Sequence, residues 1–387
     1  MELCKDILYV GVADKNIDLF EGLYEAPEGM RYNSYVILDD RIAVIDSVDG
    51  ACVGEWLENL NQTLKNRIPD YLIVQHMEPD HSAGIGEFMK RYPKAVLVAS
   101  AKAFPMLRAF FGTEYENRRK VVKEGEKLSL GKHSLTFFMA PLVHWPEVMV
   151  TYESTEKLLF SADAFGTFGT ESTEDDWACE ARRYYFGIVG KFGAPVQVLL
   201  NKARRLDIRM ICPLHGPVLK EHPEQYLNLY HTWSSYEAET KGILIAYTSV
   251  YGNTKKAVEY LADRLKEEGC PEVVLFDLCR ESMSEAVEQA FRYPAMVFAS
   301  ITYNGSVFPP MREFLLNLKE RNFQNRKIAI IENGAWAPAA GKAMQSLLAE
   351  SKNLSQISSV LTLTGALTDV EKQELSLLAK ELCEELS

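Results

Sequence analysis

The stretch HMEPDHSAG, residues 76–84, places four side chains of metal-ligand type within six positions. It follows directly on the apolar run YLIVQ, which is typical of a buried strand. Loops at strand ends often carry functional side chains, because the rigid strand fixes their position. The stretch therefore predicts a metal site where a strand passes through a loop into a helix. The four candidate ligands are His76, Glu78, Asp80 and His81.

Three further candidate ligands each come just past another apolar run. His144 follows TFFMAP, Asp163 follows KLLFSA and His215 follows RMICPL. A single histidine or aspartate in such a place is usually an ordinary polar loop residue. Seven candidates in matching positions instead predict a binuclear metal site. The remaining histidines lack this setting, and we expect them to be surface or turn residues: His133, His222 and His231.

The part of the chain before about residue 150 mixes strand-like runs with helical segments. The strand-like runs are RYNSYVILDD, RIAVIDSV, YLIVQH, AVLVAS, SLTFFMAP and EVMVTYE, followed by KLLFSADAF. Helices are predicted near 52–67, 83–91, 174–205 and 222–241, the last two from apolar positions that recur at three and four residues. This mixture favours an α/β sandwich over a parallel, doubly wound sheet.

The pattern changes after the polar segment EAETK. From there the strand-like runs GILIAYTS, EVVLFDL, AMVFASI, KIAIIEN and SVLTLTG alternate with helical segments. Such alternation predicts βαβ units and a doubly wound parallel sheet of the flavodoxin-like kind. We therefore expect two domains, residues 1–240 and 241–387.

Three loops of the second domain form a predicted flavin site. YTSVYGNT, residues 247–254, is a hydroxyl-rich strand-to-helix turn that suits a phosphate. It lacks Gly-x-Gly-x-x-Gly, which favours FMN over a dinucleotide. SITYNGS and ENGAWAP end two later strands, where a doubly wound sheet has its ligand crevice. Tyr303 and Trp336 are expected to flank the flavin ring. The expected FMN contacts are Thr248, Ser249, Val250, Tyr251, Gly252, Asn253, Thr254, Ser300, Ile301, Thr302, Tyr303, Asn304, Gly305, Asn333, Gly334, Ala335 and Trp336.

Bulk composition narrows the class of protein. A chain of 387 residues with 47% hydrophobic and 25% charged residues is typical of a soluble two-domain protein. No apolar run reaches the ~18 residues of a membrane span, and the N-terminus lacks a signal-peptide pattern. The net charge of −12 argues against nucleic-acid binding. Seven scattered cysteines without a Cys-x-x-Cys pair predict a reducing, cytoplasmic setting and no rubredoxin-type site.

The order His-x-Glu-x-Asp-His, then a histidine, an aspartate and a final histidine, resembles the di-iron site of flavodiiron proteins. Glu78 is the specific residue of this motif, because it separates flavodiiron proteins from the zinc hydrolases that share the fold. The resemblance covers the whole chain and implies a metallo-β-lactamase-like αββα domain followed by a flavodoxin-like domain. It implies that His76, Glu78 and His144 bind one iron, that Asp80, His81 and His215 bind the other, and that Asp163 bridges the two with an oxo or hydroxo group.

The same resemblance implies an oxidoreductase that reduces O2 to water, NO to N2O, or both, at non-haem iron. Mixed nitrogen and oxygen ligands with open positions suit Fe(II) for such gases. Electrons would pass through FMN from an external donor, a rubredoxin or, in a methanogen, a reduced deazaflavin. The two cofactor sites would meet across a head-to-tail homodimer or a dimer of such dimers. Two alternatives stay open: a binuclear zinc hydrolase with a fused flavodoxin module, and an FMN electron carrier with a docking scaffold.

Four residues around the predicted metal site have more than one possible role. Trp145, Tyr184 and Tyr185 are expected either to line a gas pocket or to pack in the core. Glu21 stands where some relatives carry a histidine, so the proton supply and the choice between O2 and NO stay open.

Overall fold

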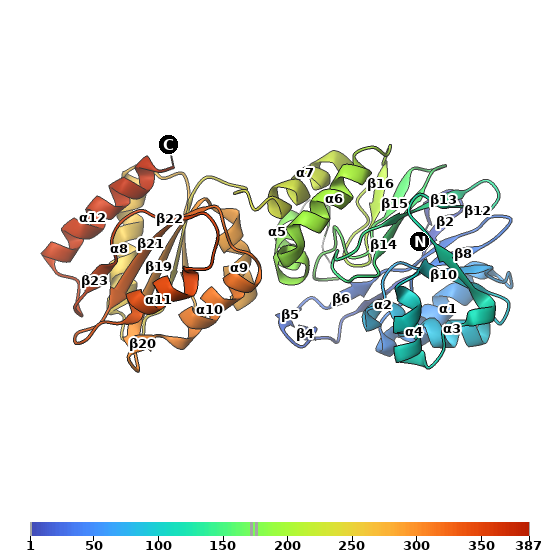
Figure 1. The fold of residues 1–387 in the computed structure, drawn as a ribbon, viewed down its shortest axis with the longest axis horizontal. Helices are drawn as coiled ribbons and strands as arrows, with labels where there is room; N and C mark the ends of the chain where they lie inside the picture. Colours follow the sequence, from blue (N-terminus) through green and yellow to red (C-terminus); the bar gives the residue numbers. More distant parts are fainter. Residues whose placement is uncertain (1, 171–172, 175–176, 387) are drawn as a thin grey trace. The chain divides into compact units, whose positions relative to one another are not determined.

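The computed structural model describes residues 2–170, 173–174 and 177–386. The chain divides into two units, Met1–His231 and Thr232–Ser387 (Figure 1). The segment before residue 241 groups with the second unit because Arg326 donates hydrogen bonds to the carbonyl oxygens of Tyr236 and Glu237. Every helix among the described residues is too short or too polar to cross a bilayer.

The first unit contains two large sheets that face each other. The first sheet has the order β1 (Glu2–Cys4), β2 (Ile7–Tyr9), β7 (Tyr35–Ile37), β8 (Ala43–Ile45), β9 (Tyr71–Val74), β10 (Val96–Ser100) and β11 (Arg119–Val122). The second has the order β12 (Lys127–Ser129), β13 (Ser134–Met139), β14 (Met149–Glu153), β15 (Leu158–Phe160) and β16 (Met210–Cys212). Two small hairpin-like pairs accompany them: β3 (Val12–Asp14) with β6 (Met30–Tyr32), and β4 (Leu19–Phe20) with β5 (Tyr24–Glu25).

The core of this unit has the layers of an αββα sandwich. One apolar cluster lies between the sheets and includes Tyr35 and Ile73 of the first sheet and Phe137 and Phe160 of the second. A second cluster covers the outer face of the first sheet with α1 (Val53–Leu64), α3 (Ile85–Arg91) and α4 (Ala103–Phe111). In Figure 1, α5 (Trp177–Tyr184), α6 (Gly193–Ala203) and α7 (Pro223–Ser234) lie beside the second sheet. The predicted sandwich is confirmed.

The helices differ from the prediction in three places. The predicted helix 174–205 is two helices, because a π-helical turn (Tyr185–Val189) and a 3-10 turn (Gly190–Phe192) separate α5 from α6; residues 175–176 lie outside the described part. The predicted helix 222–241 ends at Ser234, and α4 was not predicted at all. The sequence of α4 is mostly apolar, so apolar and polar residues do not alternate in it with a clear helical period. The segment was therefore not distinguished from the apolar strand that precedes it.

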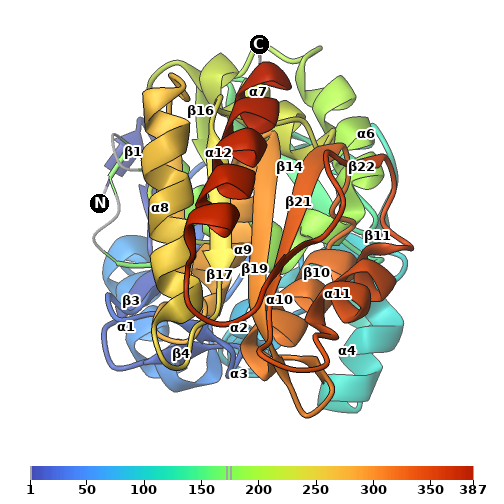
Figure 2. The same ribbon diagram turned by 90° about the vertical axis from the view of Figure 1, so that its left-hand side faces the viewer.

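The second unit is a parallel sheet of strand order β18 (Val273–Asp277), β17 (Ile243–Tyr247), β19 (Ala295–Tyr303) and β21 (Arg326–Asn333). Two short strands, β22 (Leu354–Gln356) and β23 (Leu361–Leu363), both pair with β21. Figure 2 shows α8 (Asn253–Glu267) and α12 (Asp369–Glu384) side by side on one face. The other face carries α9 (Met283–Arg292), α10 (Pro309–Glu320) and α11 (Ala340–Leu348). The predicted flavodoxin-like sheet is confirmed.

Candidate metal and flavin sites

All seven predicted metal ligands come from loops or a helix start at one end of the sandwich. His76 and Glu78 follow β9, and Asp80 and His81 lie in the short helix α2 (Pro79–Ser82). The other three follow the strands of the second sheet, as expected for ligands placed at strand ends. His144 lies between β13 and β14, Asp163 follows β15, and His215 follows β16.

The seven side chains form two groups of close ligand atoms, one with His76, Glu78, His144 and Asp163 and one with Asp80, His81 and His215. In the first group, Glu78 Oε2 lies 3.1 Å from His76 Nε2 and 3.0 Å from His144 Nε2. In the second, Asp80 Oδ2 lies 3.2 Å from the Nε2 atoms of both His81 and His215.

Asp163 lies between the groups and turns one oxygen to each. Its Oδ2 is 3.1 Å from His144 Nε2 and 3.4 Å from His76 Nε2. Its Oδ1 is 3.2 Å from His81 Nε2 and 4.0 Å from His215 Nε2. One carboxylate that faces both groups in this way has the geometry of a bridging ligand.

The charges of the site depend on one another. Burial raises the pKa of the Asp163 carboxyl, but His76, His144 and His81 outweigh it and hold that pKa well below its usual range. Burial also opposes ionisation of Glu78, yet hydrogen bonds from His144 and His76 bring its pKa to about 2. Burial lowers the pKa of His144, whereas Asp163 and Glu78 raise it to about 9. The Asp163 and Glu78 carboxylates are therefore ionised at neutral pH, as a cation site requires.

Two hydrogen bonds orient the imidazoles, and neither was predicted. Glu147 Oε1 accepts from His76 Nδ1 at 2.9 Å, and the Arg31 carbonyl oxygen accepts from His215 Nδ1 at 2.7 Å. A histidine that donates through Nδ1 presents the lone pair of Nε2 to a metal. Glu147 lies three residues after His144, but an acid at that spacing has no sequence signal of its own. The loop brings it to a different histidine.

The predicted gas-pocket residues divide into two kinds. Trp145 packs edge-on against the His76 ring at 5.3 Å between centroids, and the Tyr184 ring lies 5.5 Å from that of His215. Tyr185 contacts Phe186 and Tyr230, so it belongs to the core. Glu21 lies in the turn between β4 and β5. The residue is exposed, yet the protein atoms around its carboxyl and the charge of Glu78 raise the pKa of that carboxyl to about 7.

One of the other histidines lies in a turn, as expected, but its side chain is not on the surface. His133 is buried, and its Nδ1 lies 3.1 Å from Oε1 of the buried Glu153. His222 is exposed and His231 is half-buried. None of the three belongs to a metal-type group among the described residues. A turn between β12 and β13 packs His133 inward, which its polar sequence neighbours did not indicate.

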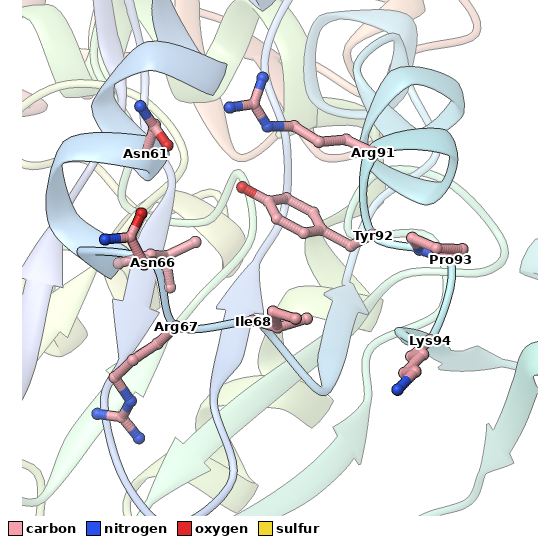
Figure 3. Close-up of a pocket in the computed structure, with 9 residues that line it drawn as sticks. Asn61, Asn66, Arg67, Ile68, Arg91, Tyr92, Pro93 and Lys94 are labelled. Atoms are coloured by element: carbon pink, nitrogen blue, oxygen red, sulfur yellow. The ribbon is translucent and has the colours of Figure 1, made fainter.

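A surface cavity of about 290 Å³ lies elsewhere on the first unit, between the C-terminal ends of α1 and α3 (Figure 3). It contains none of the candidate ligands. Figure 3 shows the Tyr92 ring reaching across it, with Arg67, Arg91 and Lys94 around the rim. Cations near helix C-termini complement the helix dipole. We therefore assign these side chains a structural role.

The three predicted flavin loops lie at the C-terminal ends of β17, β19 and β21. Side-chain hydrogen bonds connect them, since Thr248 Oγ1 lies 2.9 Å from Ser300 Oγ and Thr302 Oγ1 accepts from the Ala339 N–H at 2.9 Å. The aromatic side chains expected to flank a flavin are exposed: Trp336 is 83% exposed and Tyr303 is 47% exposed. The Asn333 side chain instead pairs with the backbone of Gly365.

Comparisons with known proteins agree with both sites. A family model described as ODP family beta lactamase matches residues 30–216, and one described as Flavodoxin domain matches residues 244–385. A solved variant of the flavo di-iron protein from Thermotoga maritima is 26% identical, with a TM-score of 0.88 over 98% of this chain and 96% of that chain. The nitric oxide reductase of Moorella thermoacetica is 31% identical over 360 residues, which is 89% of this chain and 88% of that protein.

The chain belongs to the flavodiiron protein family. The fold also matches that of rubredoxin oxygen:oxidoreductase from Desulfovibrio gigas, with a TM-score of 0.92 at 23% identity over 100% of this chain and 98% of that chain. The cofactors of this flavodiiron protein are FMN and a di-iron centre. The family thus agrees with both predicted sites and disfavours the zinc-hydrolase alternative.

The residues of this flavodiiron protein fit both cofactors. At the metal site, Asp80 Oδ1, Asp80 Oδ2 and Asp163 Oδ1 are buried and accept no hydrogen bond of good geometry from the described residues; the last two face only imidazole Nε2 atoms, which are themselves candidate ligand atoms. Buried carboxylate oxygens without donors need a cation. At the flavin site, Thr254 Oγ1 is buried at the start of α8 with no such partner. A hydroxyl and free N–H groups at a helix start suit a phosphate.

Proposed function

We propose that this flavodiiron protein reduces O2 to water, NO to N2O, or both, with electrons that pass through FMN. The observation that carries the proposal is the position of Glu78, whose Oε2 lies at 3.0–3.1 Å from two imidazoles of one metal group. A terminal carboxylate in place of a third imidazole adds negative charge, which favours a redox metal over a purely hydrolytic one.

We assign the ligands as follows. His76, Glu78 and His144 hold one iron, Asp80, His81 and His215 hold the other, and Asp163 bridges them. The iron pair, when bound, supplies electrons and open positions for the gas. The chain keeps His76 and His215 in their ligating tautomer through Glu147 and the Arg31 carbonyl oxygen, and Trp145 and Tyr184 pack against these two imidazoles.

The flavin assignment rests on the three loops. Residues 248–254 would hold the phosphate, with Thr254 Oγ1 and the N–H groups at the start of α8 as donors. Residues 300–305 and 333–336 would hold the ring, with Tyr303 and Trp336 against its faces. Asn333 would contribute through its backbone, because its side chain is paired with Gly365. We further propose residues 1–240 and 241–387 as the functional domains.

The proposal includes an external electron donor and a homodimer. The relative from Desulfovibrio gigas is named rubredoxin oxygen:oxidoreductase, which supports a rubredoxin as donor; a reduced deazaflavin is the alternative. The metal and flavin residues belong to different units of the chain, so we propose a head-to-tail homodimer, alone or paired into a tetramer, that joins them. We place the protein in the cytoplasm, with neither nucleic acid nor membrane as a partner.

Metal analysis and anaerobic stopped-flow reoxidation test the proposed activity. Reduced protein with about two irons per chain should be reoxidised rapidly by O2, by NO, or by both. Two zincs per chain with phosphodiesterase activity would favour the hydrolase instead. A flavin that stays reduced in the presence of both gases would rule out the proposal.

Glu78→His is the sharpest variant. We expect it to load zinc readily and to lose gas reduction, since a third imidazole restores a hydrolase-like ligand set. Glu87→His is the matched control, because Glu87 is an exposed residue of the nearby helix α3 that pairs with the exposed Lys90 and lies outside both metal groups. Unchanged iron loading and unchanged gas reduction in Glu78→His would remove the main support for the proposal.

A further inference from the structure

Two cysteines of the second unit lie at the end of α8, far along the chain from each other. Cys270 follows Gly269, which has φ +86°, and its backbone N–H donates to the Leu265 carbonyl oxygen at 2.9 Å. The Gly269 N–H donates to the Lys266 carbonyl oxygen at 3.1 Å. This pair of bonds is a Schellman motif, which fixes the position of Cys270 at the helix end.

Cys383 reaches the same point from the last turn of α12. Its Sγ lies 3.8 Å from the Leu265 carbonyl oxygen, the atom that also receives the Cys270 N–H. The Cys270 Sγ lies 3.3 Å from the Glu272 carbonyl oxygen, so both thiols lie beside the end of α8. Both cysteines pack against the apolar cluster beneath α8 and α12, which lie side by side in Figure 2. Two rigid helix ends therefore hold the thiols together.

The thiol pair is open to small solutes. Both cysteines are only partly buried, and both line a cavity of about 350 Å³. The other cavity residues include Lys241, Glu268, Lys380 and Glu384. A solute of the size of a peroxide can therefore reach the sulfur atoms.

We propose that Cys270 and Cys383 are a modification site, at which hydrogen peroxide oxidises the two thiols to an intramolecular disulfide. One thiolate attacks a peroxide oxygen, the O–O bond breaks, and a sulfenic acid and one water form. The second thiolate then attacks the sulfenic sulfur, and the S–O bond breaks to release a second water. Two thiols and one H2O2 thus give one disulfide and two waters.

The site reacts slowly at neutral pH and faster in base. Burial raises the pKa of the Cys383 thiol to about 11 and raises that of the Cys270 thiol as well. The charge of Glu268 raises the pKa of Cys383 further. At Cys270, the hydrogen bond from the thiol to the Glu272 carbonyl oxygen lowers the pKa, and the charge of the Glu272 side chain raises it. The cavity lysines and Glu384 are the other charged groups nearby. Only the thiolate attacks, so the rate of cross-linking should rise about tenfold for each pH unit below the pKa. The pair therefore responds to sustained peroxide rather than to brief exposure.

Peptide mapping of the full-length, cofactor-loaded protein tests the proposal. The reduced protein, freed of reductant, is treated with hydrogen peroxide, alkylated in denaturant and digested without reduction. We expect one pair of peptides that contains Cys270 and Cys383, about 2 Da lighter than their sum and separated by dithiothreitol. Catalase added before the peroxide should prevent the link.

Matched variants decide the outcome. Cys179→Ser removes an exposed thiol of the first unit and should leave the link intact. Cys383→Ser should abolish it and leave Cys270 as a sulfenic acid that dimedone traps. Recovery of both peptides alkylated, over-oxidised or linked to other cysteines would overturn the proposal. In the cross-linked protein the urea midpoint of the second unit should rise, because the disulfide ties α12 to α8; an unchanged midpoint would refute that effect.

Discussion

The imidazole of His76 is held from both sides. Its Nε2 faces Glu78 and Asp163, and its Nδ1 lies 2.9 Å from Glu147 Oε1. Glu147 Oε1 also accepts the Met77 N–H at 2.9 Å. A carboxylate behind a metal-binding histidine fixes the ring and increases its basicity.

We predict that Glu147→Gln lowers iron affinity at the proposed His76 site by about 10–100-fold. Iron retained after dialysis against a graded series of chelator concentrations measures the effect. Glu153→Gln is the control, because Glu153 is an equally buried partner of His133 that lies outside both metal groups. Equal iron loss in the two variants would contradict a role for Glu147 in positioning His76.

A second residue-scale prediction concerns the Tyr184 hydroxyl. The side chain is fully buried beside His215, and its hydroxyl has no hydrogen-bond partner among the described residues. We expect Tyr184→Phe to leave the free energy of unfolding unchanged or to raise it by up to about 1 kcal/mol, because no bond is lost. In Tyr35→Phe, removal of the hydroxyl that donates to Pro213 O at 2.6 Å should cost about 1 kcal/mol. Urea denaturation compares them, and equal losses would show a hidden partner for Tyr184.

At the scale of elements, α8 connects the proposed phosphate loop to the cysteine pair. A glycine with positive φ stands at each end of this helix: Gly252 at +87° and Gly269 at +86°. In both places an added Cβ would meet nothing within 4 Å. An alanine would therefore meet the same backbone strain at Gly252 as at Gly269, and the two substitutions differ only in which end of α8 they change.

We predict that Gly252→Ala and Gly269→Ala each lower the free energy of unfolding by about 1 kcal/mol, since alanine disfavours positive φ. Only Gly252→Ala should also weaken FMN binding, because it shifts the N–H groups at the start of α8. Flavin fluorescence during dilution measures FMN release. Faster release from the Gly269→Ala protein would argue against a local phosphate loop.

The break between α5 and α6 shows why apolar periodicity alone wrongly predicted a single helix over 174–205. Apolar spacing continues through 174–205, yet Tyr24 packs against Gly187 so closely that an added Cβ would lie 2.9 Å from its ring. The Tyr24 hydroxyl donates to the Gly187 carbonyl oxygen at 2.8 Å. Tyr24, which is far away in the chain, thus binds a carbonyl oxygen within the helical segment, and the turn around Gly187 is π-helical.

At the scale of the whole molecule, the proposed metal ligands all lie in the first unit and the proposed FMN contacts all lie in the second, so each cofactor should stabilise its own unit. We predict that removal of iron by a chelator lowers the thermal transition of the first unit, by about 2.7 kcal/mol if free iron had been at a hundred times its dissociation constant. Removal of FMN should lower only the transition of the second unit. Scanning calorimetry distinguishes the two, and a single transition that moves with either cofactor would contradict this independence.

The proposed head-to-tail dimer predicts complementation between two inactive chains. An Asp163→Asn chain would lack the iron bridge, and a Gly252→Ala chain with weakened FMN binding would lack flavin at low FMN. Co-expressed as a mixed dimer, the intact flavin site of one should serve the intact metal site of the other and restore gas reduction. Activity no greater than that of the separate variants, in a verified mixed dimer, would exclude transfer between chains.

The sequence by itself determined the two kinds of domain, their order along the chain and the seven metal-type side chains, because strand periodicity and ligand spacing are local properties. The tertiary structure decided how those side chains combine. Asp163 faces both groups because β15 lies in the sheet between β14, which follows the loop of His144, and β16, which precedes His215. Glu147 reaches His76 across a chain separation of 71 residues, which no local pattern reports. The same holds for Cys270 and Cys383, which are ordinary thiols in the sequence and neighbours only after α8 and α12 have packed on one face of the sheet.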